Sequence, residues 1–266
     1  MCNLLIFFFI LVLNFTQNQL GYSEETKKIS DNSFLIEEAY NQEAGVVQHI
    51  QTFQYTKKKD WVYTFVQEWP IVNQKHQFSY SIPVSHKSDP NTTGLSDVAI
   101  NYRYQLISND KVAMTPRLSW IFPSGNYKKE LGSNSMGFQT NLPLSIELSE
   151  QWVSHWNAGL TFVPHSKEPG GASADTTGFN AGTSLIWLLT KNFNLMFEVA
   201  WNSNESVNAD GSTERDETFF LNPGLRFAIN FPSRLQIVPG VAVPIGVGPS
   251  KDDYSIFGYL SMEHPF

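Results

Sequence analysis

The chain has 266 residues and a net charge of −7; 14% of its residues are aromatic, yet its mean hydropathy is only −0.24. Its lysines and arginines are not clustered, which argues against nucleic acid as a partner because phosphate binding needs a concentrated basic footprint. Many aromatic residues without overall hydrophobicity are typical of strands that alternate between lipid and a polar lumen. A soluble β-sandwich also alternates, so this pattern alone leaves both classes open.

The chain begins with an unbroken apolar run from Leu4 to Leu13. About ten apolar residues are too few to span a bilayer but suit the core of a signal peptide. Gly21 and Ser23 are small residues at a suitable offset for cleavage, so we expect residues 1–23 to be a signal peptide. The single cysteine, Cys2, would be removed with it, which leaves neither disulfides nor cysteine-bound metals. No later apolar run is long enough for a transmembrane helix.

Residues 24–45 form a separate segment with a polar start. The stretch 33–45 predicts a short helix, capped by Asp31 or Ser33 and ended by Gly45. Its place is either inside a barrel or in the periplasm before the barrel, and we favour the lumen.

From Val46 onward the sequence alternates between strands and turns, and residues 46–266 are expected to form one domain. Most of the expected strands have ten or more residues, longer than the about 5–6 of soluble proteins. They approach the about 9–11 residues that cross a membrane at a tilt. The expected strands are 46–56, 60–69, 76–84, 96–107, 111–122, 136–148, 152–163, 178–189, 192–202, 217–230, 234–246 and 253–266.

Within these strands an apolar face alternates with a polar one, as Val98, Ile100 and Tyr102 do with Asn101 and Arg103. In a barrel the polar face lines the lumen, where charges of both signs tune selectivity or simply pair to fill a narrow interior. A register slip of one residue would turn such a charge towards lipid. The expected lumen-lining charges are Glu68, Arg103, Arg117, Glu147, Glu198 and Arg226.

The connections alternate between short and long from the third strand onward. Short ones are expected at 108–110, 149–151, 190–191 and 232–233, and long ones at 86–95, 123–135, 164–177, 203–216 and 247–252. Outer-membrane barrels have short periplasmic turns and long external loops. We therefore predict an all-β fold, a transmembrane antiparallel β-barrel of about 12 strands. Tryptophans at strand ends are expected either to form interfacial girdles or to pack in a core.

The last strand, 253–266, places Leu260 and Met262 on one face and ends on Phe266. A final aromatic residue on such a strand resembles the carboxy-terminal signature of bacterial outer-membrane barrels. This resemblance implies that the barrel-assembly machinery recognises the strand and that lipid of the outer membrane surrounds the barrel.

Two stretches carry a closer resemblance. Gly94-Leu-Ser-Asp-Val-Ala-Ile-Asn-Tyr-Arg-Tyr-Gln-Leu106 and Pro116-Arg-Leu-Ser-Trp-Ile-Phe-Pro-Ser-Gly-Asn126 resemble the outer-membrane family named for the MetA pathway of phenol degradation, also described as transporters. Ser96 and Ser124 stand where that family has Gly and Thr. The resemblance covers 46–266 and implies the passage of small aromatic molecules.

The sequence offers little for catalysis. His86 and Ser88 have the i, i+2 spacing of a base and nucleophile on one strand face, but they lie in an expected loop. Ser154 and His155 are adjacent and would point to opposite faces. The histidines lack metal-ligand spacing, and no phosphate-binding loop is present. We therefore expect no catalytic or metal-binding residue, no cofactor and no enzyme.

The function predicted from the sequence is passive passage of small, hydrophobic or aromatic solutes across the outer membrane of a Gram-negative bacterium. A structural or surface-interaction barrel that works through its loops is the main alternative, and an outer-membrane lipid hydrolase is a weaker one.

Overall fold

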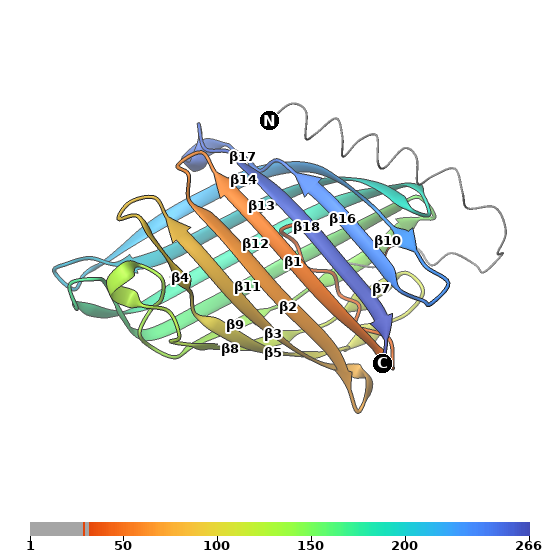
Figure 1. Cartoon of the computed structure of the whole chain (residues 1–266), viewed down its shortest axis with the longest axis horizontal. Helices are drawn as coiled ribbons and strands as arrows, with labels where there is room; N and C mark the ends of the chain where they lie inside the picture. Colours follow the sequence, from red (N-terminus) through yellow and green to blue (C-terminus); the bar gives the residue numbers. More distant parts are fainter. Residues whose placement is uncertain (1–28, 30–31) are drawn as a thin grey trace.

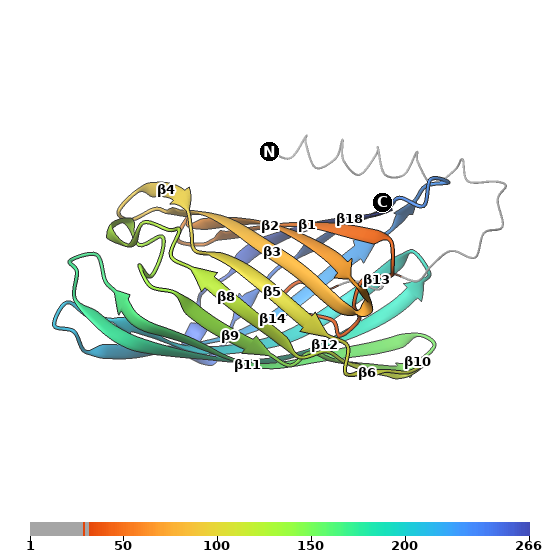
Figure 2. The same ribbon diagram turned by 90° about the horizontal axis from the view of Figure 1, so that it is seen from below.

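The computed structural model describes residue 29 and residues 32–266. Strands between Val46 and Pro265 form one closed antiparallel sheet around a lumen (Figures 1 and 2). The first strand, β1, pairs with the last, β18, over the whole of its length, and pairs on its other side with β2. Gly45 and Phe266 meet at one end of the barrel, where the Phe266 N–H donates to the Gly45 carbonyl at 3.0 Å. We name this the terminal end and the opposite one the loop end.

The sheet contains eighteen strand segments. At six places two consecutive segments continue one strand across an interruption of one or two residues, so the wall consists of twelve spanning strands, the number predicted. The segments are β1 (Val46–Thr56), β2 (Trp61–Ile71), β3 (Asn73–Lys87), β4 (Thr92–Leu95), β5 (Val98–Tyr104), β6 (Ile107–Ser108), β7 (Val112–Met114), β8 (Arg117–Phe122), β9 (Gly137–Asn141), β10 (Leu144–Ser149), β11 (Trp152–Lys167), β12 (Ser173–Thr190), β13 (Phe193–Val207), β14 (Thr213–Phe227), β15 (Ile229–Asn230), β16 (Gln236–Ala242), β17 (Ile245–Gly246) and β18 (Ser255–Pro265), with 3-10 turns η1 (Tyr127–Lys129) and η2 (Gly248–Ser250).

Prolines mark several of these interruptions. Pro116, Pro143 and Pro244 lie between β7 and β8, β9 and β10, and β16 and β17. A proline has no N–H to give to the ladder, which interrupts regular pairing. Its carbonyl still accepts: the Tyr104 N–H donates to Pro116 and the Thr115 N–H to Pro143, each at 3.1 Å. The wall therefore stays closed through its irregular points.

The strand register gives the barrel a mainly apolar outside and a mainly polar inside. Asn101 pairs with Ser79 on one side and Ser119 on the other, so these polar residues share the inner face. Outside, the Trp152 and Trp187 rings stack at 5.6 Å, and Phe266 packs edge-on against Trp69 at 5.1 Å. The alternation predicted from the sequence is confirmed in these strands.

Two connections predicted as long loops are wrong. The stretches 164–177 and 203–216 are mostly strand, because β11–β12 and β13–β14 continue as hairpins to tight turns at 168–172 and 208–212. The Asn208 N–H donates to the Ser212 carbonyl at 2.8 Å and closes the second turn. Pairing satisfies the backbone groups of these polar stretches, which the loop composition did not reveal. The resulting hairpins project at the loop end (Figure 2).

The helix predicted for 33–45 is also wrong: these residues form bends and a turn without helical hydrogen bonds. The segment enters the barrel, where lumen side chains bind its backbone groups one by one, as described below. Those bonds replace the internal bonds that a helix would make. Asp31 and the predicted signal peptide lie outside the described residues. Within residue 29 and residues 32–266, no helix is long and apolar enough to cross a membrane.

Candidate functional site

Residues 32–42, which we call the plug segment, cross the lumen and are held by the barrel wall. The Glu198 carboxylate on β13 accepts the N–H groups of Leu35 and Ile36 at 3.0 and 3.2 Å. Asn157 on β11 accepts the Glu37 N–H at 2.8 Å and donates to the Glu37 carbonyl at 2.9 Å. The amide therefore binds both backbone groups of one residue, as a neighbouring strand would.

The second half of the plug segment is bound in the same way by side chains of β3 and β10. Gln105, between β5 and β6, and Thr115, between β7 and β8, bind it as well. Ser145 Oγ accepts the Ala39 N–H at 2.8 Å, and both Gln105 and Thr115 donate to the Ala39 carbonyl. Gln105 also accepts the Asn41 N–H, and Gln77 accepts the Gln42 N–H, at 2.9 and 2.7 Å.

An apolar socket holds the first half of the plug segment. The Phe34 ring packs edge-on against Phe257 and Tyr259 of β18, with centroids 5.9 Å apart in each case. Two glycines of the wall make room for it: a Cβ added to Gly224 would lie 2.4 Å from the ring, and one added to Gly240 would lie 2.7 Å from it. Plug and wall therefore fit by shape as well as by hydrogen bonds.

The three predicted lumen arginines all contact the plug segment. Arg226 donates to the Asn32 carbonyl at 2.6 Å, and Arg103 donates to the Glu38 carbonyl. Arg117 forms an ion pair with Glu37, with 2.8 Å between Nη2 and Oε1.

The three predicted glutamates also lie on the inner face. Glu198 holds the plug segment, whereas Glu68 is buried and accepts from Gln77 at 2.8 Å. Glu147 is half-buried and shares the face of Ser145, two residues before it on β10.

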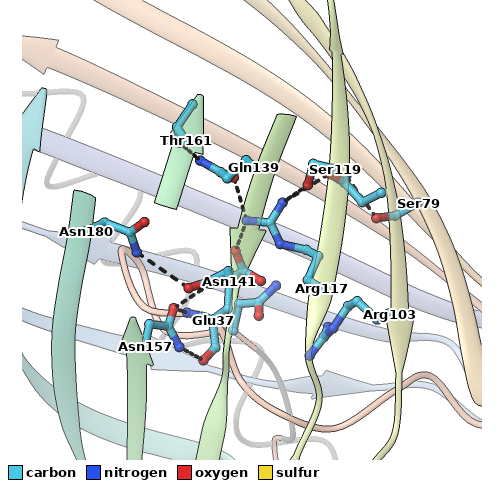
Figure 3. A network of polar contacts seen from close by, with 12 residues as sticks. Glu37, Ser79, Arg103, Arg117, Ser119, Gln139, Asn141, Asn157, Thr161 and Asn180 are labelled. Atoms are coloured by element: carbon cyan, nitrogen blue, oxygen red, sulfur yellow. Dashed lines mark hydrogen bonds and ion pairs between the residues drawn. The ribbon is translucent and has the colours of Figure 1, made fainter. Parts of the chain in front are cut away.

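Arg117 is the centre of a polar network between the plug and β5, β8, β9 and β11 (Figure 3). Besides Glu37 it donates to Asn101 at 3.1 Å, to Ser119, and to Gln139 at 2.7 Å. Gln139 in turn donates a hydrogen bond to Thr161 at 2.9 Å. The guanidinium thus ties three strands to the plug segment.

Cavities lie on both sides of the plug segment. The first, of about 330 Å³, is lined both by apolar residues and by polar or charged ones: Phe34, Leu35, Ile50, Val66, Ile121 and Tyr259 among the former, and Glu68, Asp97, Asn101, Arg103 and Arg117 among the latter. The second, of about 310 Å³, lies towards β9, β11, β12 and β13 and is almost entirely polar. Leu35 and Glu37 border both cavities. The lumen beside the plug segment therefore contains an amphipathic cavity and a polar one.

Most of the residues that hold the plug carry no distinctive signal in the sequence. Gln77, Gln105, Thr115, Ser145 and Asn157 carry no charge and looked like ordinary polar-face residues. The socket left a clearer signal. Phe257 and Tyr259 are aromatic residues on the otherwise polar face of the last strand, and an aromatic pair on a lumen face needs something to pack against.

The structure gives other partners to the His and Ser that were considered for catalysis. His86 Nδ1 contacts Thr93 Oγ1 at 2.8 Å, while Ser88 Oγ donates to Asp60 at 2.9 Å. A different pair, Ser145 Oγ and His155 Nδ1, lies 2.7 Å apart; both residues are buried, and Ser145 Oγ accepts the Ala39 N–H. Ser145 therefore helps to hold the plug segment. Among the described residues no three or more His, Cys, Asp and Glu side chains are grouped to hold a metal ion.

The two stretches that carry the family resemblance meet at the loop end. The Asp97 carboxylate accepts the N–H groups of Gly125 and Ser133 at 2.9 and 2.8 Å, and the Ser133 hydroxyl at 2.7 Å. Ser124 Oγ accepts the Val98 N–H at 2.8 Å and donates to the Ser96 carbonyl at 2.9 Å. These motifs therefore anchor the loop 123–136 to the rim of the barrel.

Comparison with known families identifies the chain. The family described as "Putative MetA-pathway of phenol degradation" matches residues 25–241. The chain belongs to this family. The match includes the plug segment as well as most of the barrel. A search of curated protein sequences gives no significant match.

Solved structures share the fold at low sequence identity. An outer membrane channel from Pseudomonas putida F1 aligns with a TM-score of 0.65 and 13% identity, covering 86% of this chain and 98% of that one. The NanC porin aligns at 0.55 and 10%, covering 82% and 100%. The KdgM porin aligns at 0.51 and 7%, covering 82% and 99%. The protein is a porin-like β-barrel of the Gram-negative outer membrane.

Proposed function

We propose that the protein is a channel through which small solutes cross the outer membrane passively, with the plug segment as its constriction. The observation that carries this proposal is a lumen divided by residues 32–42, with a cavity on each side. A barrel whose only role was structural would have no need for open volume beside a fitted segment. The charges that bind the plug would then set both its position and the selectivity of the remaining space.

The first cavity supports the passage of solutes with a hydrophobic or aromatic face. Its apolar wall is formed by Phe34, Ile50, Val66 and Tyr259, and burying apolar area there is favourable by about 25 cal/mol per Å². Among the polar residues of the lining, Asn101 keeps one amide hydrogen beyond its bond to Ser79 at 3.2 Å and can donate it to a single polar group. Small aromatic molecules with one polar substituent fit this division.

Single-channel conductance in a planar bilayer tests the channel function. The mature chain 24–266, a variant lacking 24–45, and the locked variant Ser33→Cys/Ser184→Cys are compared after a heat-modifiability gel confirms folding. The two serine hydroxyls lie 2.9 Å apart, so a disulfide between these positions needs little movement of the backbone.

Each outcome of the conductance measurement supports a different mechanism. Conductance that disappears on oxidation of the locked variant and returns on reduction means that the plug moves during opening. Conductance unchanged by oxidation means that solutes pass beside a fixed plug. Folded barrels that are silent in all three forms would contradict the channel and favour a surface-interaction role for the loops.

A further inference from the structure

The second cavity has a composition that the channel function does not by itself require. Five asparagines and one glutamine are among the eleven residues that line it: Asn141, Asn157, Asn180, Asn202, Asn204 and Gln139. The amides come from β9, β11, β12 and β13, so neighbouring strands place them side by side. Its one guanidinium, Arg117, is paired with Glu37 at 2.8 Å. The lining therefore provides many hydrogen-bonding groups and little net charge.

Part of this amide set is already used by the protein. Asn157 is engaged by Glu37 and accepts from Asn141 at 3.2 Å, and Gln139 bridges Arg117 and Thr161. These two residues fix one side of the cavity and leave little capacity for a ligand.

The other side retains free capacity. Asn180 donates to Asn141 at 3.5 Å and Asn202 donates to Thr218 at 3.4 Å, both at the long limit for a hydrogen bond. The Asn204 side chain makes no hydrogen bond within the described part of the chain. Each amide has two donors and a carbonyl that accepts twice, so these bonds leave most of its capacity unused.

The wall is shaped around two of these amides. A Cβ added to Gly159 would lie 2.4 Å from the Asn180 oxygen, and one added to Gly178 would lie 2.4 Å from the Asn204 oxygen. The glycines let both side chains lie against the sheet, which keeps the lumen beside them open. Asn204 is also exposed, so the cavity reaches solvent towards the loop end.

We propose that this amide-lined cavity binds a neutral polyhydroxylated solute, such as a sugar alcohol or a small neutral sugar. A hydroxyl group both donates and accepts, so it pairs with either end of an amide. An apolar ligand would leave the amides without partners, and a charged one would find no free counter-charge. The volume lies at the low end of the range for small-molecule sites, about 300–1,000 Å³. The proposal deepens the channel function and rests on it for the route of the solute.

The test measures the equilibrium binding of sorbitol to the refolded chain 24–266 by saturation-transfer NMR and titration calorimetry. The variant Asn180→Leu/Asn202→Leu removes two amides that the protein itself engages only through one long hydrogen bond each. The matched control is Ser81→Leu, an inner-face residue that lines the first cavity and not the second. We expect saturable binding whose affinity falls at least tenfold in the double variant and changes less than twofold in the control. Asn180→Ala/Asn202→Ala replaces the leucine variant if that one fails the heat-modifiability gel.

Two outcomes overturn the proposal: no saturable sorbitol binding to the folded wild-type barrel, or binding that the amide variants leave unchanged. Either result leaves the channel function intact if the barrel conducts. A barrel that binds sorbitol through Asn180 and Asn202 but never conducts keeps the binding site and removes the channel. The two proposals therefore fail on different measurements.

Discussion

At the scale of single residues, the contact between Gly240 and Phe34 decides how closely the plug fits. Gly240 stands in β16, where glycine ordinarily weakens a strand and often marks a close approach. Here the approaching group is a plug side chain, since the two nearest atoms to an added Cβ belong to the Phe34 ring, at 2.7 and 3.1 Å. The next is Arg226 Cβ at 3.2 Å. A single methyl group at this position therefore acts chiefly on the plug.

We predict that Gly240→Ala displaces Phe34 and raises the conductance of the barrel, at a cost of about 1–3 kcal/mol for overpacking. In a Phe34→Ala background the same change should have almost no further effect, because the colliding ring is gone. A double-mutant cycle on conductance and on proteolysis of the plug measures this coupling. Additive effects would show that Gly240 acts on the wall and not on the plug.

At the scale of elements, the loop 123–136 is anchored by one carboxylate. Asp97 accepts three hydrogen bonds from Gly125 and Ser133, and Leu131 is buried beneath the loop. Hydrogen bonds to charged groups contribute about 1.5–3 kcal/mol each. The two stretches that carry the resemblance, which are separated along the chain, are thus joined at this anchor by the bond from Gly125 to Asp97.

We predict that Asp97→Ala releases this loop and makes the barrel sensitive to trypsin after Lys128 and Lys129, with cleavage at least tenfold faster than in the wild type. The control is Asp110→Ala, in a turn at the terminal end, which should leave the rate unchanged. Mass spectrometry of the fragments identifies the cleaved bond. Equal resistance of both variants would contradict the anchoring role of Asp97.

At the scale of the whole molecule, closure depends on the last strand, which pairs with β1 on one side and with β16 on the other. Its final residue, Phe266, packs on Trp69 at 5.1 Å. We propose that the barrel-assembly machinery recognises this strand, as its resemblance to outer-membrane signatures implies. The packing of Phe266 on Trp69 and the recognition of the last strand by the assembly machinery can be tested separately, because only the packing requires Trp69.

We predict that Phe266→Ala slows assembly into outer-membrane vesicles several-fold, measured as the appearance of the heat-modifiable form. Trp69→Ala removes the same ring contact but leaves the final aromatic residue, and should assemble at nearly the wild-type rate. Equal defects in the two variants would assign the effect of Phe266 to packing alone.

The sequence by itself determined the class of fold, the number of strands and the inner face, because period-two alternation is a local property that survives any closure. It placed Arg103, Arg117 and Glu198 on the polar face for the same reason. Only the tertiary structure decided what those charges bind. The bonds from Glu198 to Leu35 and Ile36 join residues more than 160 positions apart, and no local pattern encodes such a pairing.

The helix predicted for 33–45 failed for this reason too. Local propensity favoured internal backbone bonds, but the lumen supplied Glu198, Asn157 and Ser145 as competing partners. Tertiary contacts then outweighed a weak local preference. The stretches 164–177 and 203–216, predicted as loops, are mostly strand because the two halves of each stretch pair with each other in a hairpin. Alternation along the chain determined the wall, and only the closed barrel could determine what fills it.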